Sequence, residues 1–325
     1  MTDHEGEFAR IERLARLFER DARDGSGVTL GIGDDAAILR PPADRELVWT
    51  VDAQVEGQHF RREWMSLEDI GWRSFVAAAS DLFAMGAVPW CALSALALPG
   101  ELADAALDAL TRGQAEAARE VVCPVVGGNL SRAGELSVTT TLMGSALRAV
   151  RRAGARPGDG VWLLGEIGLA AVGLHASTKQ RHGPELDAGL AAFRRPRIRA
   201  AGGRVVAEHA HAAIDVSDGL AQDAAHLATA SQVSLVLDEG ALLEHAGEAL
   251  HRAASSLGED VKTLVLAGGE DYALLATASA AMPGFTRIGE VVTGDGVWLR
   301  DARGALTPLA SHATSGFDHF ARQER

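Results

Sequence analysis

The segment from Arg148 to Asp159 (RAVRRAGARPGD) limits the possible fold most, because it interrupts the chain near its middle with Arg, Gly and Pro. This composition is typical of a connection between domains. Stretches with helical and with strand patterns alternate on both sides of it. A chain of 325 residues is long enough for two domains, each with its own core. We therefore predict two α/β domains, residues 1–147 and residues 148–325.

Hydrophobic periodicity assigns the helices and strands within these domains. Residues 8–20 place Phe8, Ile11 and Phe18 on one stripe of an amphipathic helix. Alternation over residues 136–143 predicts a strand with one buried face. The other predicted helices are residues 67–85, 102–121, 169–177, 200–209 and 220–230. The other predicted strands end at Gly31 or cover residues 46–51, 89–98, 121–126, 161–164, 214–216, 234–237 and 261–266.

The net charge of −13 limits the class of partner. Nucleic-acid-binding proteins usually carry a basic face, so we expect no nucleic acid partner. An acidic protein that handles phosphates needs a cation at its site, because carboxylates and phosphates repel one another. Lys179 and Lys262 are the only lysines, and no Gly-Lys-Ser/Thr sequence occurs, so a P-loop is excluded.

The apolar segments and the cysteines indicate a soluble, cytoplasmic protein. The longest apolar stretch, Phe83 to Gly100, is broken by Gly86 and Pro89, which predicts a helix end and a buried strand rather than a membrane span. Cys91 and Cys123 have no metal-ligand spacing, and we expect both to be buried thiols in a reducing compartment. The acidic N-terminal residues are unlike a signal peptide.

Six short motifs place an acidic or amide side chain beside Gly or Ser, after apolar residues. Oxygen ligands, with glycines that allow close backbone approach, suit Mg²⁺ held together with substrate phosphates, and we expect them at the ends of strands. Each motif alone is also typical of an ordinary turn. Asp81 lies within an apolar helical run, where a carboxylate is paired, bound to metal or turned to solvent. The motifs are GIGDDAA (31–37), VDAQVEGQH (51–59), ASDLFAMG (79–86), VGGN (126–129), IDVSDGL (214–220) and AGGED (267–271).

Other readings of single motifs are weaker or stay open. GIGDDA also fits a dinucleotide-binding pattern, but Asp34 and Asp35 would repel a pyrophosphate there unless a metal ion bridges them. His59 taken alone suits a structural or exposed histidine as well as a substrate contact. Arg151 and Arg152 suit either a phosphate contact or a solvated linker.

Taken together and in this order, the motifs make the chain similar to the thiamine-monophosphate kinase family. The segments that carry the resemblance are GIGDDAA, EGQHF, SDLFAMGA, RAGARPGD, IDVSDGL and GGEDY, and it extends from Gly6 to Phe320. The family belongs to an ATP-binding superfamily that includes aminoimidazole ribonucleotide (AIR) synthetase. The resemblance implies an AIR synthetase-like (PurM-like) fold of two α/β domains, whose N-terminal domains pair in a homodimer.

The resemblance also implies a reaction, the transfer of the γ-phosphate of ATP to thiamine monophosphate, with several Mg²⁺ ions and no catalytic side chain. The implied Mg²⁺ ligands are Asp35, Thr50, Asp52, Asp81, Asn129, Asp215 and Asp218. The implied ATP contacts are Gly128, Asn129, Arg152 and Ser217. The implied contacts to thiamine monophosphate are His59, Glu270 and Phe317, the last by stacking on the substrate ring.

Charge explains why such a reaction needs no general base. A phosphate monoester has its second pKa at about 6, so the attacking oxygen is already anionic near neutral pH. Catalysis then depends on in-line positioning and on cations that neutralise both anionic reactants. We expect the scattered aspartates to come together around these cations. The thiazolium cation favours an aromatic or acidic neighbour, the roles implied for Phe317 and Glu270.

Two departures from the family pattern leave alternatives open. Asn129 stands where the family usually has Asp, and Val51 stands where it usually has Thr. The resemblance places both in the metal site, so the number of ions and the retention of activity stay open. The alternatives are another ATP-dependent synthetase of the superfamily and a non-catalytic binder of thiamine phosphate or nucleotide.

Overall fold

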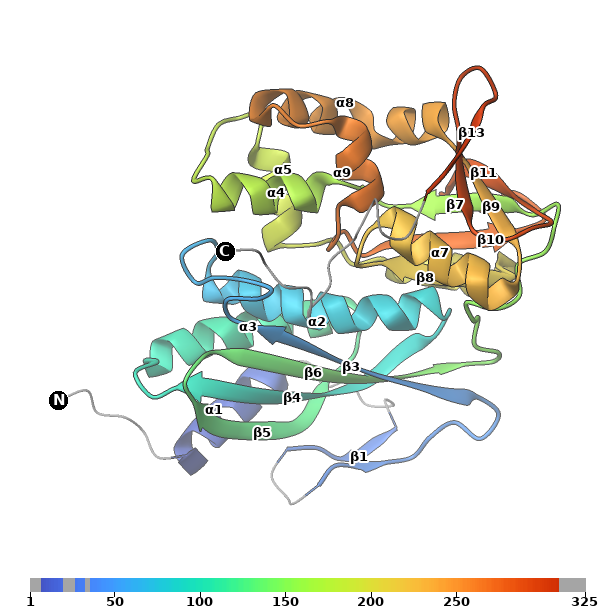
Figure 1. Ribbon diagram of the computed structural model, residues 1–325. Helices are drawn as coiled ribbons and strands as arrows, with labels where there is room; N and C mark the ends of the chain where they lie inside the picture. The colour runs from blue at the N-terminus through green and yellow to red at the C-terminus, as the bar shows by residue number, and fades with distance from the viewer. Residues whose placement is uncertain (1–6, 20–26, 33–35, 310–325) are drawn as a thin grey trace. The chain divides into compact units, whose positions relative to one another are not determined.

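The computed structural model describes residues 7–19, 27–32 and 36–309 (Figure 1). The chain divides into two compact units. The N-terminal unit comprises residues 1–82 and 87–149, and the C-terminal unit comprises residues 83–86 and 150–325. The division after residue 149 lies inside the Arg-, Gly- and Pro-rich segment.

The N-terminal unit is built on a four-stranded sheet of order β3-β6-β4-β5, in which β4 and β5 are parallel and the other pairs antiparallel. A short hairpin, β1-β2, stands apart from it. The elements are α1 (Glu7–Glu19), β1 (Val28–Leu30), β2 (Ile38–Leu39), β3 (Glu46–Val55), α2 (Leu67–Ala84), β4 (Val88–Pro99), α3 (Asp104–Glu120), β5 (Val125–Ala133) and β6 (Ser137–Ala146).

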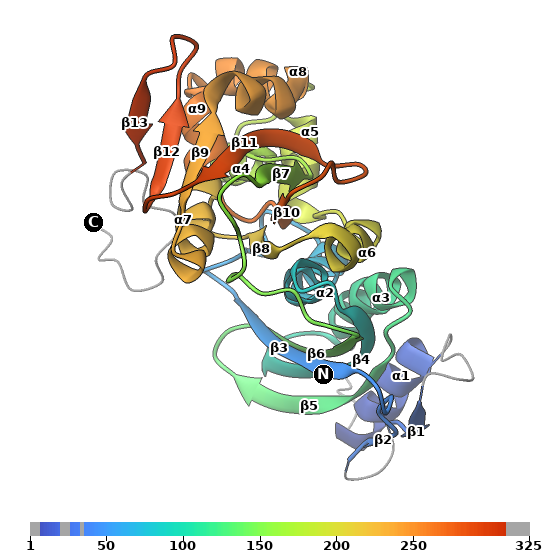
Figure 2. The same cartoon turned by 90° about the vertical axis from the view of Figure 1, so that its right-hand side faces the viewer.

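Helices α2 and α3 cover one face of this sheet (Figures 1 and 2). Gln114 of α3 is fully buried, and its amide joins the two helices to the sheet through Ser94 of β4, Ser74 of α2 and Thr140 of β6. A buried amide needs such partners, because an unpaired one would be destabilising. The polar contacts therefore fix how the helices sit on the strands.

Two glycines let α2 and α3 approach backbone to backbone. A Cβ at Gly71 would overlap the carbonyl oxygen of Leu110, and a Cβ at Gly113 would overlap that of Glu68. Glycine is otherwise unfavourable inside a helix by about 1 kcal/mol relative to Ala. Close packing of the two helices explains why it occurs at both positions.

We expect Gly113→Ala to lower the free energy of unfolding by about 1–3 kcal/mol, because the added methyl group pushes the helices apart. Gly240→Ala is the matched control: this glycine is also helical but has no atom within 4 Å of an added Cβ. Urea unfolding followed by circular dichroism measures both. Equal midpoints for the two variants would contradict close packing at Gly113.

The C-terminal unit contains a seven-stranded sheet of order β13-β12-β9-β11-β7-β10-β8. Only β9 and β12 pair in parallel among its described strands. Its strands are β7 (Gly160–Leu164), β8 (Ala212–Val216), β9 (Ser234–Asp238), β10 (Ala273–Ala278), β11 (Thr286–Val292), β12 (Val297–Arg300) and β13 (Leu306–Pro308). Its helices are α4 (Leu169–Thr178), α5 (Asp187–Arg194), α6 (Ala200–His209), α7 (Leu220–Ser231), α8 (Glu239–Leu257) and α9 (Val261–Ala267).

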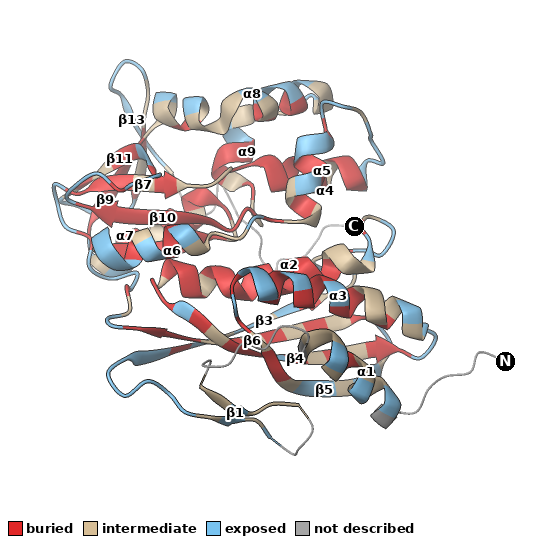
Figure 3. Cartoon of the chain, turned by 180° about the vertical axis from the view of Figure 1, so that it is seen from behind, coloured by how far each residue is buried: buried red, intermediate tan, exposed pale blue. Residues whose placement is uncertain are grey.

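The core of the C-terminal unit lies on one face of the sheet. Side chains from α4, α5, α7, α8 and α9 share a single apolar cluster with the strands, and the buried positions of this cluster are red in Figure 3. Helix α6 packs on other side chains of β7 and β10, since a Cβ at its Gly202 would overlap Leu164. The sheet is therefore covered on both faces near β7 and β10.

Most predicted elements are confirmed, but two strands need correction. Residues 261–266, predicted as a strand, form α9. Asp260 begins this helix by accepting from the backbone N–H of Thr263 at 2.9 Å, an N-cap that outweighs the β-forming Val and Thr residues. The strand predicted at 121–126 is β5, which begins later and continues through the VGGN motif.

The cysteines are confirmed as buried. Burial raises the pKa of Cys91 to about 11 and the pKa of Cys123 well above its usual value. Both thiols are therefore neutral and unreactive. None of the helices within the described ranges has the length and apolar character needed to cross a membrane.

Candidate functional site

Strand β3 and helix α2 bring Thr50 and Asp81 together in the N-terminal unit. The Thr50 hydroxyl donates to Oδ2 of Asp81 at 2.5 Å. Side chains alternate along β3, so Asp52 and the buried Gln54 lie on the same face as Thr50. Gln54 in turn accepts from the guanidinium of the fully buried Arg73 of α2. The helix-covered face of β3 thus carries a row of polar side chains.

The expected position of these carboxylates at strand ends is wrong in the N-terminal unit. Asp52 lies in the second half of β3, whereas Asp81 lies inside α2, where the predicted helix 67–85 places it. Asn129 lies in the middle of β5. The reason is that β3 and β5 continue through their motifs, because Ala53 to Val55 and Leu130 to Ala133 extend the sheet pairing.

The sheet register separates Gly128 from Asn129. Asp52 pairs with Thr140, Thr140 with Ser94, and Ser94 with Gly128, so these four positions share one face. Asn129 pairs with Ala95 in the next row and lies on the opposite face. A Cβ at Gly128 would overlap the carbonyl oxygen of Ser94, so the close approach of β4 requires glycine there.

Val51 also lies on the sheet face opposite Thr50 and Asp52. Its side chain is 62% exposed. The Val51 departure from the family pattern therefore removes no oxygen from the immediate surroundings of the Thr50–Asp81 pair. Val51 and Asn129 share the sheet face that α2 and α3 leave open.

His59 lies in the turn that follows β3. Its Nδ1 accepts from the backbone N–H of Val55 at 3.0 Å, and Gly57 turns the chain with φ of +85°. With Nδ1 as acceptor, a neutral imidazole carries its proton on Nε2. The turn therefore fixes both the ring orientation and the tautomer of His59.

The C-terminal unit brings Ser217, Asp218 and Glu270 together. Asp215 is in β8 and 5% exposed, and Ser217 and Asp218 occupy the turn between β8 and α7. The backbone N–H of Glu270 donates to the carbonyl oxygen of Ser217 at 2.7 Å, and that of Tyr272 donates to Val216 at 2.9 Å. Two motifs about 50 residues apart in the chain thereby form one surface of two adjoining loops.

The pKa of Asp223 shows how much negative charge gathers beside β8. Burial, followed by the charges of Asp215 and Asp218, raises the pKa of this carboxyl to about 8, against the opposing hydrogen bonds from the backbone of Asp218 and Ser217. Three carboxylates this close favour either protons or a cation. Carboxylate oxygens are the ligands that a hard divalent cation such as Mg²⁺ prefers.

Sequence reasoning missed Asp223, and it included Asp271 only as the last residue of the AGGED motif, without a role of its own. Asp223 accepts from the backbone of the Ser217–Gly219 turn, and Asp271 accepts from the backbone at the start of α4. The position of Asp223 in the first turn of α7 is a signal for capping. Nothing local to Asp271 indicates its partners, which precede it by about 100 residues.

Of the three remaining predicted site residues, Arg152 is the one that the structure describes, and no described contact joins it to the loops of Ser217 and Glu270. Arg152 is exposed, and its carbonyl oxygen accepts from the hydroxyl of Ser231 at 2.8 Å. Asp35 and Phe317 lie outside the described residues. The described part of the chain contains no group of three His, Cys, Asp or Glu residues arranged to hold a metal ion. The candidate ligands thus need phosphate oxygens or water to complete a magnesium shell.

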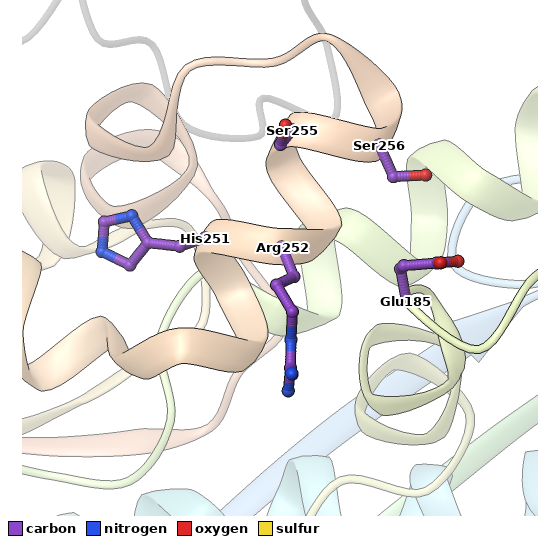
Figure 4. A pocket seen from close by; sticks show the side chains of 5 residues that line it. All are labelled: Glu185, His251, Arg252, Ser255 and Ser256. Carbon is purple, nitrogen blue, oxygen red and sulfur yellow. The ribbon is translucent and has the colours of Figure 1, made fainter.

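The hollow shown in Figure 4 contains none of the predicted site residues. Its side chains come from α8 and its C-terminal turn and from the loop before α5, and they do not converge on one point (Figure 4). A binding site normally places several polar groups around one ligand position. The residues that line the hollow are Glu185, His251, Arg252, Ser255 and Ser256.

Asp271 makes stability depend on pH. Burial raises its pKa to about 7, with a further contribution from Glu270, while its backbone hydrogen bonds and Arg199 oppose the rise. The folded protein then keeps a proton that the unfolded chain releases near pH 4, so the free energy of unfolding falls as pH rises from about 4 to about 7. We expect Asp271→Asn to remove this contribution. The urea midpoint of the wild type minus that of the variant should become smaller as the pH rises through this window. A difference that does not change with pH would contradict the raised pKa of Asp271.

Comparisons with known proteins show which protein family the chain matches. The AIR synthase related protein N-terminal domain matches residues 33–146, and the corresponding C-terminal domain matches residues 156–301. The thiamine-monophosphate kinase of Mycobacterium tuberculosis is 36% identical over 304 residues, which cover 89% of this chain and 86% of that protein.

Solved structures agree with this relationship. The thiamine-monophosphate kinase of Stenotrophomonas maltophilia K279a matches with a TM-score of 0.80 and 34% identity, over 90% of this chain and 96% of that one. AaThiL complexed with AMPPCP and TMP matches with a TM-score of 0.75 and 31% identity, over 90% of this chain and 93% of that one. The two AIR synthase related domains of this chain and its match to these structures confirm the predicted AIR synthetase-like fold class. The chain therefore belongs to the thiamine-monophosphate kinase family of AIR synthase related proteins.

Proposed function

We propose that this protein transfers the γ-phosphate of ATP to thiamine monophosphate, producing thiamine diphosphate and ADP, with Mg²⁺ as cofactor. The observation that carries the proposal is the similarity to AaThiL, which binds AMPPCP, an ATP analogue, together with TMP. The similarity covers 90% of this chain, so both units take part in it.

Each unit contributes side chains to the proposed mechanism. Mg²⁺ would neutralise charge on both anionic reactants, and a phosphate oxygen would attack in line without a general base. The loop carrying Ser217 contacts ATP, together with Gly128, Asn129 and Arg152. Glu270 faces the thiazolium cation, with His59 and Phe317 as further contacts to thiamine monophosphate. The proposed Mg²⁺ ligands are Asp35, Thr50, Asp52, Asp81, Asp215 and Asp218; Asn129, on the opposite sheet face from Asp52, is not proposed as a ligand to the same ion.

We also propose that the protein is a homodimer that works in the cytoplasm. The open face of the N-terminal sheet exposes Leu47, Trp49 and Val51 of β3, by 48%, 66% and 62%, and Leu93 of β4 by 39%. Large exposed apolar side chains gathered on one face of a sheet are typical of a protein interface. A second copy offers the same apolar face, which makes a symmetric pairing self-complementary. Two buried thiols suit a reducing compartment.

The test is to incubate purified protein with Mg-ATP and thiamine monophosphate and to separate the thiamine products by chromatography. We expect thiamine diphosphate and ADP in equal amounts, and none of either after EDTA is added. Free thiamine in place of the monophosphate tests the acceptor. ATP turnover without thiamine diphosphate would indicate another synthetase of the superfamily. Binding of both ligands without turnover would indicate a non-catalytic binder.

A further inference from the structure

The carboxylate of Asp223 fixes the turn that presents Ser217 and Asp218. Its Oδ2 accepts from the backbone N–H groups of Ser217, Asp218 and Gly219 at 3.0, 3.1 and 3.2 Å. The residue is 3% exposed, so water does not compete for these donors. Three donors on one oxygen set the direction of three successive peptide groups. The side chains that leave this turn are oriented accordingly, and Gln222 further holds the carboxylate of Asp218 at 3.2 Å.

The carboxylate of Asp271 fixes the second loop. Its Oδ2 accepts from the N–H of Gly168 at 2.6 Å, and its Oδ1 accepts from that of Ala170 at 3.0 Å. These donors belong to the first turn of α4, where N–H groups have no partner within the helix. Both oxygens of Asp271 are thus used, in contrast to the single oxygen of Asp223. The neighbouring Glu270 is thereby anchored to α4.

The second loop would not hold its shape without such anchors. Glu270 and Tyr272 adopt left-handed backbone conformations, with φ of +66° and +48°. This conformation costs roughly 1–2 kcal/mol per non-glycine residue, so surrounding contacts must impose it. A Cβ at Gly269 would lie 2.6 Å from the carbonyl oxygen of Ser217, which shows how closely the two loops approach. The absence of a side chain at Gly269 is therefore what lets the two loops meet.

We propose that Asp223 and Asp271 are positioning residues for the phosphoryl transfer proposed above, on which this inference rests. Asp223 orients Ser217 and Asp218, the side chains proposed for ATP and Mg²⁺. Asp271 orients Glu270, the side chain proposed for thiamine monophosphate. Neither carboxylate touches a reactant. Their effects should therefore separate by substrate, because each supports the loop that serves one of the two.

Alanine and asparagine variants at both positions test the proposal. Loss of a supporting partner typically costs about 10–100-fold in activity. We expect Asp223→Ala to lower kcat/KM for Mg-ATP by about that factor, and Asp271→Ala to raise KM for thiamine monophosphate more than KM for ATP. Asn keeps one acceptor oxygen. It should therefore rescue function at position 223, where one oxygen accepts all three bonds, but not at position 271, where both oxygens accept.

Asp159→Ala is the matched control. Asp159 is also buried, at 2% exposed, and also accepts from a backbone N–H, that of Arg156 at 2.9 Å. Asp159 comes just before the start of β7, whereas Gly168, the partner of Asp271, comes after the end of that strand. The control should lose stability but keep the kcat and KM of the folded fraction. Hydrogen exchange of the ligand-free proteins gives a readout that does not depend on catalysis: Asp223→Ala should speed exchange at Ser217–Gly219.

The outcomes separate the two proposals. A wild-type protein without kinase activity contradicts the proposed function. If the wild type is active but Asp223→Ala and Asp271→Ala behave like Asp159→Ala, only the positioning roles are overturned. Unchanged hydrogen exchange at Ser217–Gly219 in Asp223→Ala overturns them as well. If the alanine variants fail to fold, the asparagine variants decide, and equal losses at positions 223 and 271 overturn the proposal.

Discussion

Asp81→Asn is expected to lower turnover by more than about 100-fold while leaving the fold intact. Loss of an outer partner of a metal site already costs 10–100-fold, and loss of a ligand should cost more. Asn has the size of Asp and can still accept from the Thr50 hydroxyl that now contacts Asp81 at 2.5 Å. The variant therefore removes a charge rather than a contact. Steady-state turnover at saturating Mg²⁺, measured together with thermal unfolding, separates the two effects.

Glu68→Gln provides the control for Asp81→Asn. Glu68 lies on the same helix, loses the same charge, and pairs with Arg112, with side chains 47% and 52% exposed. Exposed pairs contribute little to stability, about 0–1 kcal/mol. Turnover should be unchanged in this variant. Near-normal turnover of Asp81→Asn at saturating Mg²⁺ would contradict the role of Asp81 as a ligand.

Asp81 also shows what the sequence could predict about the candidate site. A carboxylate inside an apolar helical run is paired, bound to metal or turned to solvent, so the sequence alone marks position 81 as a candidate. The structure supplies Thr50 as one such partner. The pairing itself could not be predicted, because it depends on which face of β3 meets α2.

The two faces of the N-terminal sheet show that residues adjacent in a motif need not lie together in the structure. VDAQVEG and VGGN each place their residues next to one another in sequence, yet Val51 and Asn129 lie on the opposite sheet face from Asp52 and Gly128. Strand alternation is enough to separate Val51 from Asp52 once the strand is known to continue. Placing Asn129 relative to Asp52 needs the register across four strands, which no local pattern contains.

The fold was predicted best where periodicity was long. Helices α2 and α3 and strand β4 were found because their patterns run for 12 or more residues. Helix α9 has only seven residues, and its Val and Leu content resembles a buried strand, so the Asp260 cap decides its structure. Helices α5 and α8 and strands β2 and β10 to β13 were not predicted, and for α8 the reason is that Gly247 interrupts the helical pattern.

Asp223 and Asp271 could not be identified because their partners are backbone groups. A side chain that accepts from backbone N–H groups needs no particular residue types opposite it. Other side chains at positions 217 and 218 would leave the same backbone donors, so no pairing signal appears in the sequence. Only the folded loops show which carboxylates support a site and which belong to it.

Trp49→Asp is expected to convert the proposed dimer into a monomer. Trp49 has the largest exposed fraction, 66%, among the apolar side chains on the open face of β3. In a symmetric pairing each substitution acts twice. A hot-spot residue contributes at least about 2 kcal/mol, so the two copies together should weaken the dimer by about a thousandfold or more. Analytical ultracentrifugation across a concentration series measures this change directly.

Leu306→Asp is the control for the dimer prediction. Leu306 is also exposed, by 51%, but lies on β13 at the edge of the C-terminal sheet. Its replacement introduces the same carboxylate at an exposed apolar position that is not part of the N-terminal sheet, so the oligomeric state should not change. A wild-type protein that is monomeric at micromolar concentration, or a Trp49→Asp variant that still sediments as a dimer, would show that this sheet face does not pair two copies.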